Sequence, residues 1–209
     1  MRIGKLAIGT LLIFAASTVQ AQTYTSQSSF LAAIQSGYYL ETFDSLPGYN
    51  SVSSPMTFSQ NGFSYSAAAS SGLYGVTPDL GVPADHALST NGSSDAITFT
   101  FTSGNITAVG GQFFQTAFDG TQTPGDATVT FNDGTTATLT ATAGTPQPFF
   151  GYVSTVPILS LTVTVPQNFA TVNNFIATPE PGSLALLVGM SVTGAGFLAR
   201  RRHNARQAV

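Results

Sequence analysis

The chain has 209 residues, of which 7% are charged, and it contains no Cys and no Trp. All six basic residues lie near the two ends, so residues 22–178 hold eight carboxylates and neither Lys nor Arg. A domain without basic residues cannot neutralise phosphates, which argues against nucleic-acid binding. The lack of Cys excludes disulfides, thiolate metal sites and a Cys nucleophile.

The first 21 residues have the layout of a secretory signal peptide. Arg2 and Lys5 precede an apolar run over residues 6–16, and Ala21 closes the segment with a small side chain. Signal peptidase recognises a charged start, an apolar stretch and small residues before the cleavage point. We therefore expect removal of residues 1–21 and export across the inner membrane, with an uncleaved anchor as the alternative.

Residues 22–178 are expected to form one exported domain that begins with a short helix near residues 28–36. Ser28 and Ser29 can cap this helix, and Gly37 is expected to end it. After the helix the hydrophobic period changes to two. In residues 96–102 and 159–165, apolar side chains alternate with Ser or Thr, as in strands with one buried face.

Further strands are expected at residues 38–43, 62–67, 106–116, 149–153 and 171–177. Asn132-Asp133-Gly134 separates two more strands, because Asp-Gly supplies the positive φ angles of a tight hairpin turn. Many short strands with Gly, Pro and Ser between them predict an all-β antiparallel sandwich or jelly roll. The expected core residues are Ile97, Phe99, Phe101, Val129, Phe131, Leu139, Leu161 and Val163.

One group of residues invites a catalytic interpretation. Asp85, His86 and Ser89 are close in sequence, but they lie in a loop rich in Pro and Gly and the chain has no Gly-x-Ser-x-Gly elbow. A glycosidase needs two facing carboxylates, whereas Glu41 and Asp44 are expected on opposite faces of one strand. We therefore expect no enzymatic activity.

Binding residues are suggested by aromatic, acidic and hydroxyl side chains. Tyr49 and Tyr74, like Tyr39 and Tyr152, are expected in or near loops where a ring can stack on a neutral sugar, although aromatic residues also fill cores. Asp119 and Asp126 enclose a polar loop that offers oxygen ligands to calcium, although turns use the same residues. The rows Thr98/Thr100/Thr102, Thr136/Thr138/Thr140 and Thr162/Thr164 each line one sheet face and offer a regular surface to ice or polysaccharide, although Thr is also a good strand former.

The C-terminal region has three parts in a fixed order. Pro179-Glu180-Pro181-Gly182 comes first, an uncharged apolar run over residues 183–199 follows, and Arg200, Arg201 and Arg202 come last. The apolar run is near the shortest length that spans a bilayer as a helix. The arginines are expected to stay in the cytoplasm together with the tail at residues 203–209.

This order resembles the PEP-CTERM sorting signal of Gram-negative bacteria, a segment also labelled an ice-binding-protein C-terminal domain. The resemblance covers residues 178–202. It implies processing by an exosortase, a membrane enzyme similar to a cysteine transpeptidase, in bacteria that make exopolysaccharide. It also implies that Glu180 and its flanking prolines are recognition residues.

The middle of the chain resembles exported PEP-CTERM β-sandwich proteins at residues 41–44, 106–111 and 149–152. This implies a jelly-roll-like fold. By resemblance to jelly-roll carbohydrate-binding modules, Glu41 or Asp44 is expected to meet Asn173 and Asn174 at a structural calcium.

The function expected from these features is that of a non-catalytic cell-surface or extracellular-matrix protein. The expected partners are signal peptidase and the exosortase during export, and in addition exopolysaccharide, with a transient stay in the inner membrane. A calcium-stabilised carbohydrate-binding module is the alternative, and a secreted hydrolase is the third possibility. No cofactor is expected, apart from the calcium of the alternative.

Overall fold

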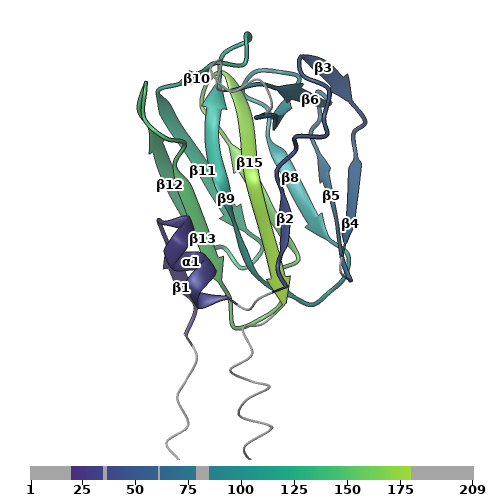
Figure 1. Cartoon of the computed structure of the whole chain (residues 1–209), viewed down its shortest axis with the longest axis vertical. Coiled ribbons are helices and arrows are strands. Elements are labelled where there is room, and N and C mark those ends of the chain that lie inside the picture. The colour runs from purple at the N-terminus through teal and green to yellow at the C-terminus, as the bar shows by residue number, and fades with distance from the viewer. Residues whose placement is uncertain (1–19, 35–36, 61, 79–84, 180–209) are drawn as a thin grey trace, which may run out of the picture.

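The computed structural model describes residues 20–34, 37–60, 62–78 and 85–179. Their strands form two antiparallel sheets that pack face to face as a β-sandwich (Figure 1). The all-β antiparallel sandwich expected from the sequence is thereby confirmed. Most of the predicted signal peptide, and the predicted sorting segment from residue 180 onward, lie outside the described residues.

The first sheet, called the nine-stranded sheet after its described strands, follows the order β1-β13-β9-β15-β7-β6-β3. In addition, β10 pairs with β9, and β2 pairs with β15. Its strands are β1 (Gln22–Tyr24), β2 (Tyr39–Glu41), β3 (Asn50–Val52), β6 (Leu73–Val76), β7 (Ala87–Thr90), β9 (Ile106–Thr116), β10 (Gln122–Thr123), β13 (Phe149–Val153) and β15 (Phe169–Pro179).

The second sheet, the six-stranded sheet, follows the order β12-β11-β14-β8-β5-β4 among the described strands. Its strands are β4 (Met56–Gln60), β5 (Phe63–Ala68), β8 (Ile97–Phe101), β11 (Gly125–Phe131), β12 (Thr136–Ala141) and β14 (Ser160–Thr164).

The core lies between the two sheets and is rich in aromatic rings. All eight core residues predicted from the alternation are buried. Phe99 of β8 and Phe175 of β15 stack with ring centroids 4.4 Å apart, which joins the two sheets directly. Leu159 departs from the alternation, because it precedes β14 and is exposed. The register expected for the strands is otherwise confirmed.

The hairpin between β11 and β12 forms where it was predicted, but with a different turn. Gly134 has a φ of 87°, whereas Asn132 and Asp133 keep ordinary negative φ angles. The backbone N–H of Gly134 donates to the Phe131 carbonyl, and that of Phe131 donates to the Thr135 carbonyl. One left-handed residue therefore suffices, and Gly134 supplies it.

Strand β15 contains an irregularity that has consequences for both faces of its sheet. Its register against β9 shifts between Asn173 and Ile176, and Asn174 has a φ of 48°. Before the shift, β15 pairs with β7 through Thr171 and Val172, and after it β15 pairs with β2. Such a bulge turns successive side chains out of strict alternation.

Helix α1 (Gln27–Ala33) covers part of the outer face of the nine-stranded sheet, meaning the face turned away from the core (Figure 1). Its N-cap is Ser26, whose side chain accepts a hydrogen bond from the Ser29 backbone N–H, so the predicted caps Ser28 and Ser29 are wrong. Both lie inside the first turn of the helix, two and three residues after Ser26, where they cannot act as its N-cap.

The two ends of the described domain lie at the same end of the sandwich. In Figure 1, β1 and the last residues of β15 are both at the bottom, whereas β3, β6 and β10 are at the top. We call the end that carries β3, β6 and β10 the distal end. A chain attached through residue 179 therefore carries the distal end away from its point of attachment.

Candidate functional site

The larger of the two described cavities lies on the outer face of the nine-stranded sheet and has a volume of about 720 Å³. We call it the amide cavity, because side-chain amides dominate its polar lining. Gln112 of β9 and Asn174 of β15 contribute to it, together with the β9–β10 hairpin and the loop after β12. The lining residues are Pro78, Asp85, Gln112, Thr121, Gln122, Gly144, Thr145, Pro146, Gln147 and Asn174.

Hydrogen bonds fix the polar groups of the amide cavity. The Asn174 amide donates to Gln112 Oε1 at 2.7 Å, and the neighbouring Asn173 amide donates to Asp85 Oδ1 at 2.8 Å. Asn173 faces outward by ordinary alternation opposite Gln112, and the bulge in β15 brings Asn174 to the same face. Gln122 Nε2 is buried, and in the described residues it has no hydrogen-bond partner. Gln122 thus lines the cavity with a side chain whose amide nitrogen is shielded and unpaired, and such a group is costly unless it gains a partner.

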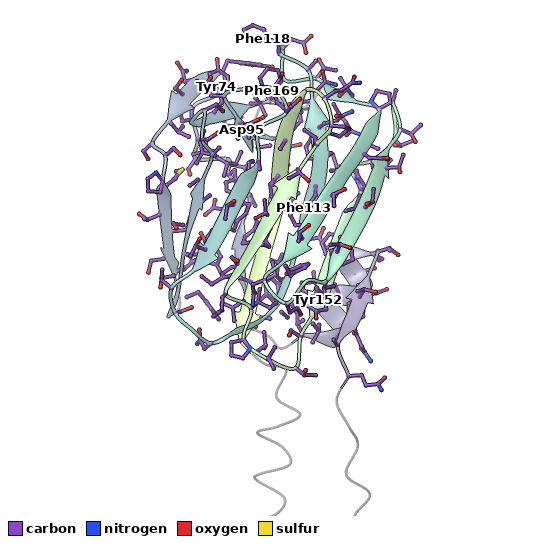
Figure 2. All side chains as sticks on the ribbon, turned by 180° about the vertical axis from the view of Figure 1, so that it is seen from behind. Tyr74, Asp95, Phe113, Phe118, Tyr152 and Phe169 are labelled. Carbon is purple, nitrogen blue, oxygen red and sulfur yellow. The ribbon has the colours of Figure 1, made fainter. Side chains whose placement is uncertain are left out.

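A second cavity of about 260 Å³ lies at the distal end on the other side of the β9–β10 hairpin, and we call it the aromatic cavity. Figure 2 shows its three aromatic residues, Tyr74, Phe118 and Phe169, near the distal end. Phe118 is 88% exposed, and its ring centroid is 6.3 Å from that of Phe169. Phe118 therefore presents an apolar ring to solvent at the mouth of the aromatic cavity.

Polar groups border the aromatic cavity. Ser89, Thr90, Asn91 and Thr116 line it. Thr171 shares hydrogen bonds with Ser89 at 3.0 Å and with Thr116 at 2.9 Å, so three strands are linked by buried hydroxyl groups. These hydroxyl contacts tie β7, β15 and β9 together beneath the aromatic cavity.

The tyrosines predicted to bind sugar divide into two pairs. Tyr74 lines the aromatic cavity and donates to the Tyr49 carbonyl at 2.6 Å. Tyr49 is 42% exposed and its ring lies against Gly120 of the hairpin. Tyr39 and Tyr152 are buried in strands, which corrects their placement in or near loops. Their hydroxyls donate to Glu41 and Asp133 respectively, and burial, followed by the contact with Glu41, raises the pKa of Tyr39.

The carboxylates predicted to bind calcium have separate partners. Asp119 accepts from the Thr121 backbone N–H, which lowers its pKa, and Asp126 accepts from Thr140 in the six-stranded sheet. The Glu41 carboxylate accepts a hydrogen bond from the Phe43 backbone N–H. The Asp44 carboxylate accepts one from the His86 backbone N–H. No group of three or more His, Asp or Glu side chains comes together in the described part of the chain. Calcium binding stays a prediction.

The strand pairing behind the calcium resemblance is present. Glu41 of β2 lies opposite Phe175 of β15, so an early acidic strand does pair with the last described strand. The amides of Asn173 and Asn174, however, contact Asp85 and Gln112 rather than Glu41 or Asp44. Asn174 therefore belongs to the lining of the amide cavity, and the buried Asn173 supports it from behind through Asp85.

The residues considered for a nucleophile group have other partners. The Ser89 hydroxyl donates to the Ala170 carbonyl and contacts Thr171, and Asp85 is bonded to Asn173. His86 Nδ1 is buried and has no hydrogen-bond partner among the described residues. A Ser–His–carboxylate relay needs these three side chains bonded to one another.

Asp95 is a structural carboxylate that the sequence analysis did not identify. It accepts hydrogen bonds from the Ser71 backbone and side chain, from Ser70 and from the Ala96 backbone, at 2.6–2.9 Å. Desolvation raises the pKa of Asp95, but these four donors outweigh it and leave the pKa lowered. The carboxylate therefore fastens the loop before β6 to the start of β8 (Figure 2).

The threonine rows occupy the outer face of the six-stranded sheet, as the alternation predicts. Thr98 and Thr162 are 3.3 Å apart across β8 and β14, and Thr128 and Thr138 are 3.2 Å apart across β11 and β12. This face is hydroxyl-rich, and among the described residues that point out of the sheet Asp126 is its one charged group.

Comparison with known proteins adds no further assignment. No protein-family model, no curated protein and no solved structure matches the chain. Residues 20–34, 37–60, 62–78 and 85–179 include no helix with the length and hydrophobicity needed to cross a bilayer. The predicted membrane helix at residues 183–199 lies outside these ranges.

Proposed function

We propose that the chain is an exported, non-catalytic protein of the cell surface or extracellular matrix, sorted by an exosortase in an exopolysaccharide-producing bacterium. In this proposal signal peptidase removes residues 1–21, and residues 183–199 hold the precursor in the inner membrane. Arg200, Arg201 and Arg202 keep the tail inside, since basic residues flanking a membrane helix stay in the cytoplasm.

The polarity of the sandwich is the observation that carries this proposal. The end of β15 lies at one end of the sandwich, and the amide and aromatic cavities involve the hairpin at the opposite, distal end (Figure 1). The proposed sorting signal starts at Pro179, the last residue of β15. A domain processed at that point displays its cavities outward from the membrane.

The distribution of carboxylates supports a non-catalytic role. Separate carboxylates accept hydrogen bonds from backbone N–H groups, hydroxyls or amides. These carboxylates are Glu41, Asp85, Asp95 and Asp126. Hydrolysis of a glycoside uses a pair of carboxylates that flank the bond to be broken.

The recognition of the sorting signal has a physical basis in its two prolines. Pro181 disfavours the helical conformation at Glu180, which keeps this stretch extended between the sandwich and the apolar run. An extended segment at the outer membrane boundary is accessible to a membrane-embedded transpeptidase. The apolar run carries three glycines and is near the lower length limit for spanning, which suits a temporary anchor.

Processing tests the proposal. In a host with the sorting enzyme, the intact mass of surface protein is expected to show the loss of residues 1–21 and 200–209. The Glu180→Ala variant is expected to accumulate as precursor in the inner membrane, whereas Gln207→Ala, in the tail, is expected to be processed normally. If surface protein retains the tail and Glu180→Ala changes nothing, residues 183–199 form a plain tail anchor and the proposal is wrong.

Carbohydrate binding, with or without calcium, is the second candidate. The aromatic cavity favours it, because exposed rings next to neutral hydroxyl and amide groups suit the apolar faces and hydroxyls of sugar rings. Tyr74 was expected in this role from the sequence, and Phe118 and Phe169 line the same cavity.

A further inference from the structure

We propose that the amide cavity binds a neutral saccharide through Asp85, Gln112, Gln122 and Asn174. This inference rests on the second candidate function above and names its ligand class and its hydrogen-bonding site. At about 720 Å³ the cavity falls within the range of about 300–1,000 Å³ that is typical of small-molecule sites. It is therefore large enough for a short saccharide segment.

The lining offers both halves of the hydrogen bonds that sugar hydroxyls make. A hydroxyl donates one hydrogen bond and accepts up to two, and a side-chain amide provides both a donor and an acceptor group. Gln112, Gln122, Gln147 and Asn174 bring four amides into one cavity, and Thr121 adds a hydroxyl. A purely apolar or a purely acidic ligand would leave part of this set unpaired.

Two of these amides, those of Gln112 and Asn174, are oriented by a mutual hydrogen bond before any ligand binds. Gln112 Oε1 accepts from the Asn174 amide, which directs the Gln112 nitrogen away from that contact, and within the described residues this nitrogen makes no recorded hydrogen bond. Gln122 Nε2 is buried, and within the described residues no acceptor reaches it. A buried amide nitrogen without a partner is costly. A ligand hydroxyl in the cavity can accept from the Gln112 nitrogen, whereas the Gln122 nitrogen is shielded and needs a rotation of its side chain to reach the ligand.

Charge selects a neutral ligand over an ionic one. Asp85 is the carboxylate in the described lining, and residues 22–178 contain no Lys or Arg to pair with an acid. Uronates, phosphates and sulfates are therefore repelled rather than held. A single carboxylate is also a poor calcium ligand set, because calcium takes six to eight oxygens. Asp85 instead suits a hydroxyl donor from a neutral sugar.

Binding of short neutral saccharides to the full-length chain tests this inference. The chain is purified in a polyoxyethylene detergent, which carries no sugar headgroup, and is titrated by calorimetry with xylohexaose, cellohexaose, maltohexaose and trigalacturonate. At least one neutral hexamer is expected to bind, and trigalacturonate is not. If none of the three neutral hexamers binds, or if trigalacturonate binds best, the inference is wrong.

Variants locate the site. Thr145→Arg places a long charged side chain at an exposed position of the lining, and it is expected to weaken binding of the neutral hexamer at least about tenfold. Thr155→Arg is the matched control. Thr155 is also exposed, but it lies between β13 and β14 near the start of β9, far from the hairpin. Equal binding by both arginine variants and by the wild type would overturn the assignment.

A second, nearly isosteric variant guards against a folding defect. Asp85→Asn keeps the size of the side chain and an oxygen for the Asn173 amide. It is expected to weaken binding of the neutral hexamer about tenfold without lowering the melting temperature by more than a few degrees. Unchanged binding would rule out the carboxylate contact. A correctly processed surface protein that binds no neutral hexamer would overturn the inference but not the proposed sorting.

Discussion

The contact between helix α1 and the nine-stranded sheet predicts a specific rescue between two substitutions. The Phe30 ring lies over the backbone of β9 and β13, where Gly110 and Gly151 leave room for it. A Cβ added at Gly151 would lie 2.5 Å from Phe30 Cδ2 and 2.7 Å from Cγ. Gly151→Ala therefore creates a clash that only movement of the ring can relieve.

The magnitudes follow from this geometry. Phe30→Ala removes a fully buried ring and is expected to lower the free energy of unfolding by about 3–5 kcal/mol. Gly151→Ala overpacks the site and is expected to cost about 1–3 kcal/mol. In the double variant the clash has disappeared with the ring. Its stability is therefore expected to be close to that of Phe30→Ala alone, a coupling within the range of about 0.5–3 kcal/mol seen for residues in contact.

Gly110→Ala provides the matched control. A Cβ at Gly110 would lie 2.8 Å from the Phe30 ring but also 2.9 Å from Phe149 Cζ. Removing Phe30 relieves only the first of these contacts, so rescue is expected to be partial. Urea unfolding followed by circular dichroism measures the stability of the three single variants and of the two double variants, which combine Phe30→Ala with Gly151→Ala or with Gly110→Ala. Additivity within about 0.5 kcal/mol for Phe30→Ala and Gly151→Ala would refute this account of the interface.

Two further predictions concern Asp95 and Phe118. Because the pKa of Asp95 is lowered in the folded state, its stabilisation is present above the unfolded value of 3.8 and is lost as the pH falls through the lower folded pKa. Urea midpoints of wild type and Asp95→Asn are therefore expected to differ at pH 7 and to draw together as the pH falls below 3.8; a gap that does not narrow would contradict the hydrogen-bond assignment. Phe118→Ser is expected to change stability by less than about 0.5 kcal/mol, because the side chain is 88% exposed, yet to reduce retention on a neutral polysaccharide column about threefold. Val156→Ser, at another exposed apolar residue, is the control, and equal retention of both variants would count against the aromatic cavity.

Strands with regular alternation could be predicted from the sequence. In β8, β11 and β14 every second residue is apolar, so both the strand and its buried face were evident. In β7 all four residues are buried, including Ser89 and Thr90, because their hydroxyls find partners inside the fold. In the sequence alone, polar residues such as Ser89 and Thr90 indicate a loop, because their buried partners cannot be seen there. Strand β7 was therefore not predicted.

The site was harder to predict because it depends on contacts between distant segments. Asp85 and Asn173 are 88 positions apart, and Gln112 and Asn174 are 62 positions apart. The bulge at Asn174 that brings these amides to one face has no sequence signature beyond two consecutive Asn, which occur in many turns. Phe118 had a usable signal, since an aromatic residue next to Asp119-Gly120 stands in a turn where no core is expected.

Strand β15 is the last described element in the chain and yet lies in the interior of its sheet, between β9 on one side and β7 and β2 on the other. Until residues 169–179 are available, β13 and β9 have no hydrogen-bonded connection to β7, β6 and β3 within this sheet. Domains form as units when their non-local pairings can close. The sandwich is therefore complete only once nearly the whole domain has been synthesised, and under the proposed export this leaves its N-terminal portion without the closing strand while that portion crosses the membrane. Formation of the last strand therefore sets when the fold is completed. That step can occur only when synthesis has reached residues 179–182.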